Sequence, residues 1–214
     1  MIEQRVGLEH GAGRLHVPPA VGLAALFSGV ALVAHVVSGI SLRAMLLLTS
    51  STVALSVGAL WRRAAPDDRR RLAHVFAIGA GTGLLATVAY DAAKYALSIW
   101  DPSPYNPFEV IRIFGVLLAG PSAGPVLTYA SGITFHAVNG TSFGIAYTFL
   151  FGSRGALAGI VWGLFLETFQ LTLYPGWLNI RAYREFAQIS ALSHVVYGLV
   201  LGLLARRLLW RIAR

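Results

Sequence analysis

The chain has 214 residues, of which 56% are hydrophobic and only 12% charged. Soluble domains carry about 25% charged residues, so this composition excludes a water-facing globular protein and predicts a membrane protein. The lack of cysteine excludes disulfides, thiolate metal sites and iron–sulfur clusters. The net charge of +8 does not indicate nucleic acid as a partner, because the arginines stand at the ends of apolar segments, as membrane topology requires.

Six apolar segments follow one another along the chain, and each approaches the length of about 20 residues that spans a bilayer. Residues 1–16 are predicted to form a cytoplasmic segment and residues 17–210 a single transmembrane helical domain. The first apolar segment is interpreted as a retained anchor, because no small-residue cleavage site follows it. The predicted spans are 17–40, 43–62, 73–98, 127–151, 155–173 and 187–210.

The connection between the third and fourth spans reads WDPSPYNPFEVIRIFGVLLAGPSAGP, and its prolines break any continuous helix. Residues 108–119 are predicted to form a short helix that lies in the membrane interface or re-enters the membrane. A seventh span arises only if this segment crosses. The fold class expected is all-α, a polytopic bundle of about six spans.

The arginines predict the orientation through the positive-inside rule. With both termini in the cytoplasm, twelve arginines fall inside and four outside, and both dense clusters fall inside only for an even number of spans. The inner ones are Arg5, Arg14, Arg62, Arg63, Arg69, Arg70, Arg71, Arg154, Arg206, Arg207, Arg211 and Arg214. The outer ones are Arg43, Arg112, Arg181 and Arg184. The predicted location is therefore the cell (inner or plasma) membrane.

Glycines recur within the spans, often four residues apart, a spacing that lets helix backbones approach closely. We expect them to pack the bundle rather than to act in a site, and they leave room for a helix-packing oligomer. They are Gly79, Gly81, Gly83, Gly140, Gly144, Gly155, Gly159, Gly163, Gly198 and Gly202.

Six ionisable residues on five predicted spans share one depth. At 1.5 Å per residue, all lie about 6–14 Å below the outer boundary. A charge at the bilayer centre costs at least ~2.5 kcal/mol, so such residues face the bundle interior, pair with one another and mark a functional site. They are His35, Asp91, Lys94, His136, Glu167 and His194.

Asp91 and Lys94 stand three residues apart in YDAAKYAL and can neutralise each other on one helix face. The alternative is that Lys94 snorkels to the outer interface. Lys94 is the only lysine beside sixteen arginines. A compact amine at a depth where arginine would be costly favours a role in the site.

Three consecutive spans each present a metal ligand or proton carrier with a hydrogen-bonding residue on the same face. Two histidines and one carboxylate suit Zn, Fe or Mn with open coordination positions. The same set could instead form a proton relay or bind a small polar ligand, and any single histidine could make only an interhelical hydrogen bond. The candidate metal or proton residues are His136, Glu167 and His194, and the supporting residues are Asp91, Lys94, Asn139, Gln170, Tyr197 and His35.

The motifs AYDAAKYAL, FHAVNGTSFGIAY, LAGIVWGLFLE and LSHVVYG resemble the YagU-type inner-membrane proteins over residues 85–207. The resemblance implies that Lys94, His136 and His194 occupy positions shared with that family. The position of Glu167 is a histidine there, an exchange that a metal ligand or proton carrier tolerates. The family has no established activity that could be carried over.

Three functions remain open at this level. The first is a binding or transport protein that takes up a metal ion, a proton or a small solute at an outer-leaflet site. The second is a membrane-embedded metalloenzyme acting on a lipid or quinone, with Asp91 as acid or base, although no dense ligand motif such as H-E-x-x-H occurs. The third is a structural subunit whose polar layer only holds the helices together. The lipid bilayer is the expected partner in each case.

Overall fold

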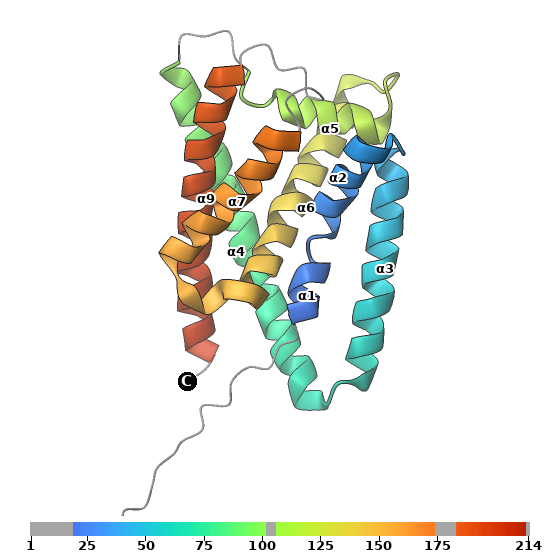
Figure 1. The fold of residues 1–214 in the computed structure, drawn as a ribbon, viewed down its shortest axis with the longest axis vertical. Coiled ribbons are helices and arrows are strands. Elements are labelled where there is room, and N and C mark those ends of the chain that lie inside the picture. The colour runs from blue at the N-terminus through green and yellow to red at the C-terminus, as the bar shows by residue number, and fades with distance from the viewer. Residues whose placement is uncertain (1–18, 102–105, 174–182, 213–214) are drawn as a thin grey trace, which may run out of the picture.

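The computed structural model describes residues 19–101, 106–173 and 183–212, and in this part of the chain it contains helices and no strand (Figure 1). The expected all-α fold class is confirmed for these residues. The predicted cytoplasmic segment 1–16 lies outside them. The helices are α1 Pro19–Ala24, α2 Phe27–Ser38, α3 Leu42–Arg63, α4 Pro66–Ile99, α5 Glu109–Ala119, α6 Pro125–Phe151, the 3-10 turn η1 Gly152–Arg154, α7 Ala156–Leu173 and α9 Tyr183–Ile212.

In the part of the chain that the structure describes, three helices are long and apolar enough to cross a membrane. They are α3, α4 and the part of α9 from Arg184 to Ile212, while Phe27–Ser38 and Ala156–Thr172 are shorter apolar helices. Many large apolar side chains on the outside of the bundle are exposed, including Leu47 and Leu55 on α3. A surface of this kind is stable only in contact with lipid, and the chain is accordingly a membrane protein.

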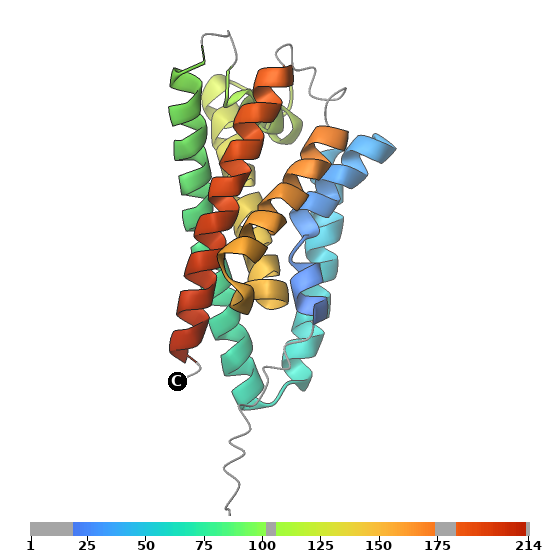
Figure 2. The same cartoon turned by 60° about the vertical axis from the view of Figure 1, so that its left-hand side comes forward.

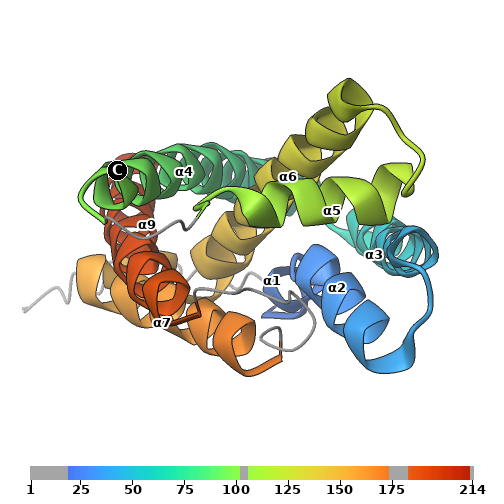
Figure 3. The ribbon, with the colours of Figure 1, turned by 90° about the horizontal axis from the view of Figure 1, so that it is seen from above.

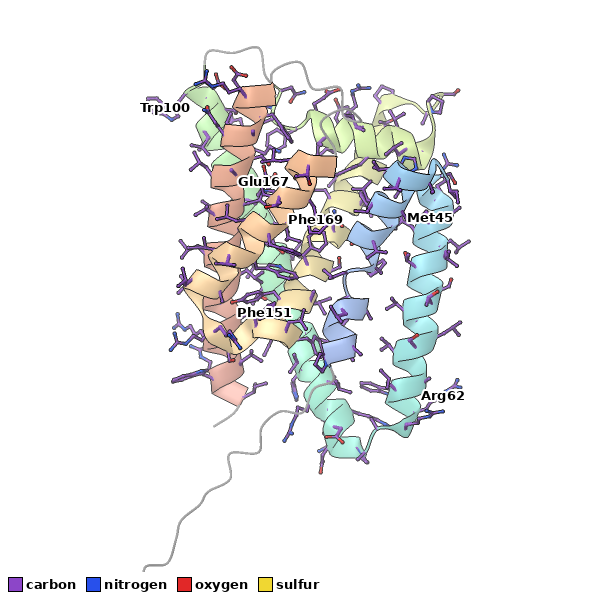
Figure 4. All side chains as sticks on the ribbon, viewed as in Figure 1. Met45, Arg62, Trp100, Phe151, Glu167 and Phe169 are labelled. Atoms are coloured by element: carbon purple, nitrogen blue, oxygen red, sulfur yellow. The ribbon has the colours of Figure 1, made fainter. Side chains whose placement is uncertain are left out.

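The two ends of the bundle differ in chemistry. One end, here called the arginine end, contains the connection from α3 to α4 with Arg62 and Arg69, and the end of α9 lies there as well (Figure 1). The opposite end, here called the Trp100 end, contains Trp100 and the connection from α2 to α3 (Figure 4). Arg69 donates to the carbonyl oxygens of Ala64 and Arg62, so it closes the α3–α4 turn.

The predicted first span, 17–40, is not one helix. It divides into α1 and α2 around Ala25 and Leu26, where the Leu26 amide bonds to the Leu23 carbonyl in a tight turn. Neither residue is a helix breaker, so hydropathy alone could not locate this interruption. Non-helical backbone at membrane depth is tolerated where it lines a cavity, and Leu26 does line one, as described below.

One buried hydrogen bond fastens α2 to α6. The hydroxyls of Ser28 and Ser142 lie 2.6 Å apart, and Ser28 is completely buried. Replacing Ser28 by Ala is expected to cost about 1 kcal/mol, because one net hydrogen bond is lost, and to lower the melting temperature by about 2–4 °C. Exposed Ser51 on α3 supplies the control. If Ser51→Ala in the same detergent lowers the melting temperature as much, this bond does not secure α2.

Helix α5 lies across the Trp100 end of the bundle (Figures 1 and 3). Its 11 residues span roughly 16 Å, about half of the hydrocarbon thickness, so it cannot cross as a helix. Its buried residues Phe114 and Gly115 face the bundle, and Gly115 packs against the backbone of Thr128 on α6. Where a short helix over 108–119 is predicted, the structure thus has α5, which is too short to span the bilayer.

The predicted glycine packing is confirmed for two helix pairs. Helices α4 and α6 meet where a Cβ on Gly144 would overlap the backbone of Gly83, and α7 meets α9 where a Cβ on Gly159 would overlap the carbonyl of Gly198. Gly81 is an exception, because nothing lies within 4 Å of its Cβ position. These two contacts set the relative height of the helices that supply the polar residues.

Candidate functional site

The first polar pair joins α4 to α6. His136 Nε2 lies 3.0 Å from Oδ1 and 3.2 Å from Oδ2 of Asp91. The pair follows from the helix contact next to it, where Gly140 is so close to Thr87 that a Cβ would overlap the threonine hydroxyl. One turn further towards the Trp100 end, α4 reaches Asp91 and the antiparallel α6 reaches His136. The backbone contact thus sets these two side chains opposite each other.

The second pair joins α7 to α9 in the same way. Gly163 packs against the carbonyl of His194, and one turn further Glu167 faces Ser190. Glu167 Oε2 lies 2.9 Å from His194 Nδ1 and also accepts a 2.9 Å hydrogen bond from the Ser190 hydroxyl. Glu167 is 2% exposed, and its other oxygen, Oε1, has no hydrogen-bond partner among the described residues. Oε1 is therefore the oxygen of this carboxylate that can still accept a hydrogen bond.

Tyr90 connects the two pairs. Its ring centroid lies 5.9 Å from that of His136 and 4.8 Å from that of His194, the latter edge to face. Lys94 Nζ donates to the Tyr90 hydroxyl at 3.2 Å and lies 5.2 Å from the ring centroid. Lys94 is 2% exposed, so its amine stays in the bundle and does not snorkel to the interface. Asp91 pairs with His136 instead of with Lys94, which corrects the expectation from their spacing.

The hydrogen positions on both imidazoles follow from their partners. His194 Nδ1 faces Glu167 Oε2 and, also at 2.9 Å, the Ser190 carbonyl oxygen, so it carries the hydrogen, since a carbonyl only accepts. The same holds for His136 Nε2 when Asp91 is ionised. Each neutral ring then keeps one bare nitrogen, Nδ1 of His136 and Nε2 of His194, that can accept a proton or a hydrogen bond.

Both histidines lie on the wall of one cavity with a volume of about 520 Å³. Helices α2, α6 and α7 provide most of the wall, and α4, α5 and α9 each contribute two residues. Tyr90 is also on the wall, whereas most other lining residues are apolar, such as Phe143 and Leu166. An apolar cavity of this size with a few polar groups is typical of a small-molecule site. In Figure 4, Glu167 and Phe169 mark the two sides of α7, of which Phe169 belongs to the cavity.

Three of the predicted supporting residues also line this cavity. Asn139 has a buried Oδ1 atom without a hydrogen-bond partner among the described residues. The Gln170 amide lies 3.4 Å from the Ser190 hydroxyl, and the Tyr197 hydroxyl donates to the Gly140 carbonyl at 2.9 Å. His35 is not among the residues that line this cavity, and its Nδ1 lies 2.6 Å from the carbonyl oxygen of Ile40 in the α2–α3 connection. The contacts described above join the other five ionisable residues of the predicted layer into one cluster through Tyr90.

The predicted metal ligands do not form one group. Among residues 19–101, 106–173 and 183–212, no three His, Asp or Glu side chains are placed to hold a metal ion together. The reason is the pairing itself, because Glu167 and His194 bind each other while His136 binds Asp91. The geometry is that of two histidine–carboxylate pairs.

Two residues of the cluster were not predicted. Tyr90 stands directly before Asp91, and Ser190 stands one helical turn before His194. Polar or aromatic residues one turn away from an ionisable residue share its face, which is the signal that could have found Ser190. No sequence signal distinguishes Tyr90 from the exposed Tyr95, because both flank the same charged turn.

No protein-family model, curated protein or solved structure matches this chain in the three comparisons made with known proteins.

Proposed function

We propose that this chain is a six-span protein of the cell membrane with both termini in the cytoplasm. The six apolar segments and the grouping of arginines at one end of the bundle support this topology. The arginine end would then face the cytoplasm, and the Trp100 end with the cluster of Asp91, His136, Glu167 and His194 would face outward. Membership of the YagU-type family, inferred from residues 85–207, remains a prediction.

We infer that the protein binds a small solute in the cavity beneath the Trp100 end and exchanges protons with it or with the outer solution. One observation carries this inference, namely that both His136 and His194 are held by carboxylates on the wall of one cavity. A carboxylate that holds the N–H side of an imidazole orients the ring and strengthens its other nitrogen as a base. Such a pair can receive a proton and return it to a bound molecule.

The cost of this arrangement supports a function beyond packing. Ionisable groups inside a membrane are expensive and usually lie on substrate or proton pathways. Packing of α7 on α9 is already provided by Gly159 and Gly198. Oε1 of Glu167 and Oδ1 of Asn139, which have no hydrogen-bond partner in the described part of the chain, add cost and no packing. A purely structural layer would gain from replacing them with apolar side chains.

A divalent metal stays a second candidate for the bound species, and a metalloenzyme remains the enzymatic alternative. Either would need Glu167 or Asp91 to leave its present partner, because the described residues form two separate pairs. Binding of a metal is therefore proposed only together with a rearrangement of these side chains.

Native mass spectrometry of protein extracted in lipid nanodiscs tests this function. The wild-type chain is expected to retain one small molecule, and the variant that combines His136→Ala with His194→Ala is expected to lose it, because both basic nitrogens are removed. His35→Ala is the matched control, since His35 lies near the same end and bonds to the Ile40 carbonyl. It should retain the bound mass.

Elemental analysis of the same samples separates the candidates. A stoichiometric metal lost in the double variant would support the metal alternative. A wild-type protein that carries neither a bound mass nor a metal, with a double variant that unfolds like a packing variant, would contradict the binding function. The polar layer would then be structural.

A further inference from the structure

The cavity reaches the outside of the bundle at its side. Four of its lining residues are exposed apolar side chains, Val30 and Val37 on α2 and Phe165 and Phe169 on α7. Val37 is 74% exposed and Phe165 is 47% exposed. Helices α2 and α7 lie at the periphery, with α6 behind them (Figures 2 and 3). Among the described residues, the cavity therefore opens laterally between these two helices.

A lateral opening determines whether a ligand enters from the lipid or from water. Apolar side chains at the opening face hydrocarbon in a membrane protein. A strongly polar solute would have to cross lipid to enter here, whereas a molecule dissolved in the bilayer already lies beside the opening. Inside, Leu32, Phe143 and Leu166 continue the apolar lining, so the body of the ligand must be apolar as well.

Apart from the Gln170 amide, which has a second N–H to donate, three polar atoms available in the cavity are acceptors. His136 Nδ1 and His194 Nε2 are the bare ring nitrogens, and Asn139 Oδ1 has no hydrogen-bond partner among the described residues. The one hydroxyl hydrogen of Tyr197 is already donated to the Gly140 carbonyl. The amine of Lys94 is directed at the Tyr90 hydroxyl. A ligand head can satisfy these acceptors only by donating hydrogen bonds, because an acceptor facing an acceptor is repelled.

We propose that the cavity binds a membrane-soluble molecule with an apolar body and a hydroxyl-bearing head, an alcohol or phenol, which enters sideways between α2 and α7. The inference rests on the binding function proposed above and names its ligand class. The hydroxyl donates to the bare nitrogen of His136 or His194, and the apolar part lies between α2, α6 and α7. Anionic heads such as carboxylates and phosphate esters are disfavoured, because they present mainly acceptors to the same atoms.

The test uses 4-dodecylphenol with a photoreactive diazirine in its alkyl chain, added to the full chain in lipid nanodiscs. Labelled peptides are expected to map to α2, α6 and α7. Unlabelled 4-dodecylphenol should compete, while its methyl ether, 4-dodecylanisole, should compete about tenfold more weakly, because it has lost one donated hydrogen bond. Dodecanoate should also compete more weakly than the phenol.

Substitutions at the opening test the lateral route of entry. Ala34→Trp, on the α2 wall of the cavity, is expected to abolish labelling. Leu47→Trp adds the same side chain to the exposed face of α3, where it is 70% exposed in the native chain, and should label normally. Should Ala34→Trp fail to fold, Val37→Trp at the exposed opening is the second variant, and it should reduce labelling.

Each result supports or overturns the inference. Equal competition by the phenol and the methyl ether would refute the hydroxyl head, and stronger competition by dodecanoate would assign an anionic ligand instead. Normal labelling of a folded Ala34→Trp or Val37→Trp protein would refute the lateral route. If the phenol fails to label while native mass spectrometry finds a bound polar solute, this inference fails and the proposed function stands. If neither finds a ligand, both fail.

Discussion

Gly159→Leu is expected to prevent α7 from packing on α9 and to destabilise the protein by about 3 kcal/mol or more, the upper range for overpacking. A Cβ at this position would overlap the carbonyl of Gly198 and approach the backbone of Gly202, and backbone atoms cannot move aside as a flexible side chain does. The measurement is the melting temperature, together with the monodisperse yield in detergent.

Gly81→Leu is the matched control, because nothing lies within 4 Å of the Gly81 Cβ position. Both variants add the same side chain to an apolar helix, α7 or α4, so the main difference is what the side chain meets. Equal melting curves would show that α7 and α9 are not in backbone contact. If only Gly159→Leu lowers the melting temperature, that variant should also lose the small molecule expected in native mass spectrometry, because Gly163, one turn further on, sets Glu167 beside Ser190.

Glu167→Ala is expected to destabilise the protein by about 2–4 kcal/mol, whereas Glu167→Gln should cost less than about 1 kcal/mol. Alanine removes the acceptor of the Ser190 hydroxyl and one of the two acceptors of the His194 Nδ1–H. It also leaves a void, because the residue at this position is only 2% exposed. Glutamine keeps an acceptor oxygen at the same place. The free energy of unfolding in detergent, measured by chemical denaturation, gives both values.

The neighbouring substitution Thr168→Ala is the control for Glu167. Thr168 lies on the exposed side of α7, and its hydroxyl donates to the Leu164 carbonyl of its own helix, so loss of this hydroxyl should leave stability nearly unchanged. Glutamine at 167 also separates folding from proton exchange, because it accepts the same hydrogen bonds but takes up no proton. A Glu167→Gln protein that is stable and still exchanges protons with its ligand would remove this carboxylate from the proposed function.

The two histidine–carboxylate pairs differ in how exposed their side chains are. Asp91 and His136 have side chains that are 33% and 20% exposed, whereas Glu167 and His194 have 3% and 12%. The first pair is thus the one in contact with the surroundings, and the second is the more secluded one. Tyr90, packed against both imidazoles, lies between them.

Several features of this protein follow from the sequence alone. The paucity of charge predicts a membrane protein, the proline-rich connection predicts a short separate helix near 108–119, and the glycine spacing predicts close helix contacts. The ionisable residues on α4, α6, α7 and α9 can also be assigned to one depth. All of these depend on local hydropathy, on helix breakers and on a rise of 1.5 Å per residue, which vary little with context.

The choice of partners depends on the tertiary structure. Spacing favours Asp91 with Lys94, but the rotation of α4 against α6, which the contact of Thr87 with Gly140 sets, turns Asp91 towards His136. The break between α1 and α2 and the cavity beside it are likewise absent from the hydropathy pattern. Depth is determined by position along a single helix, whereas pairing is determined by how neighbouring helices are rotated and packed, which no single segment encodes.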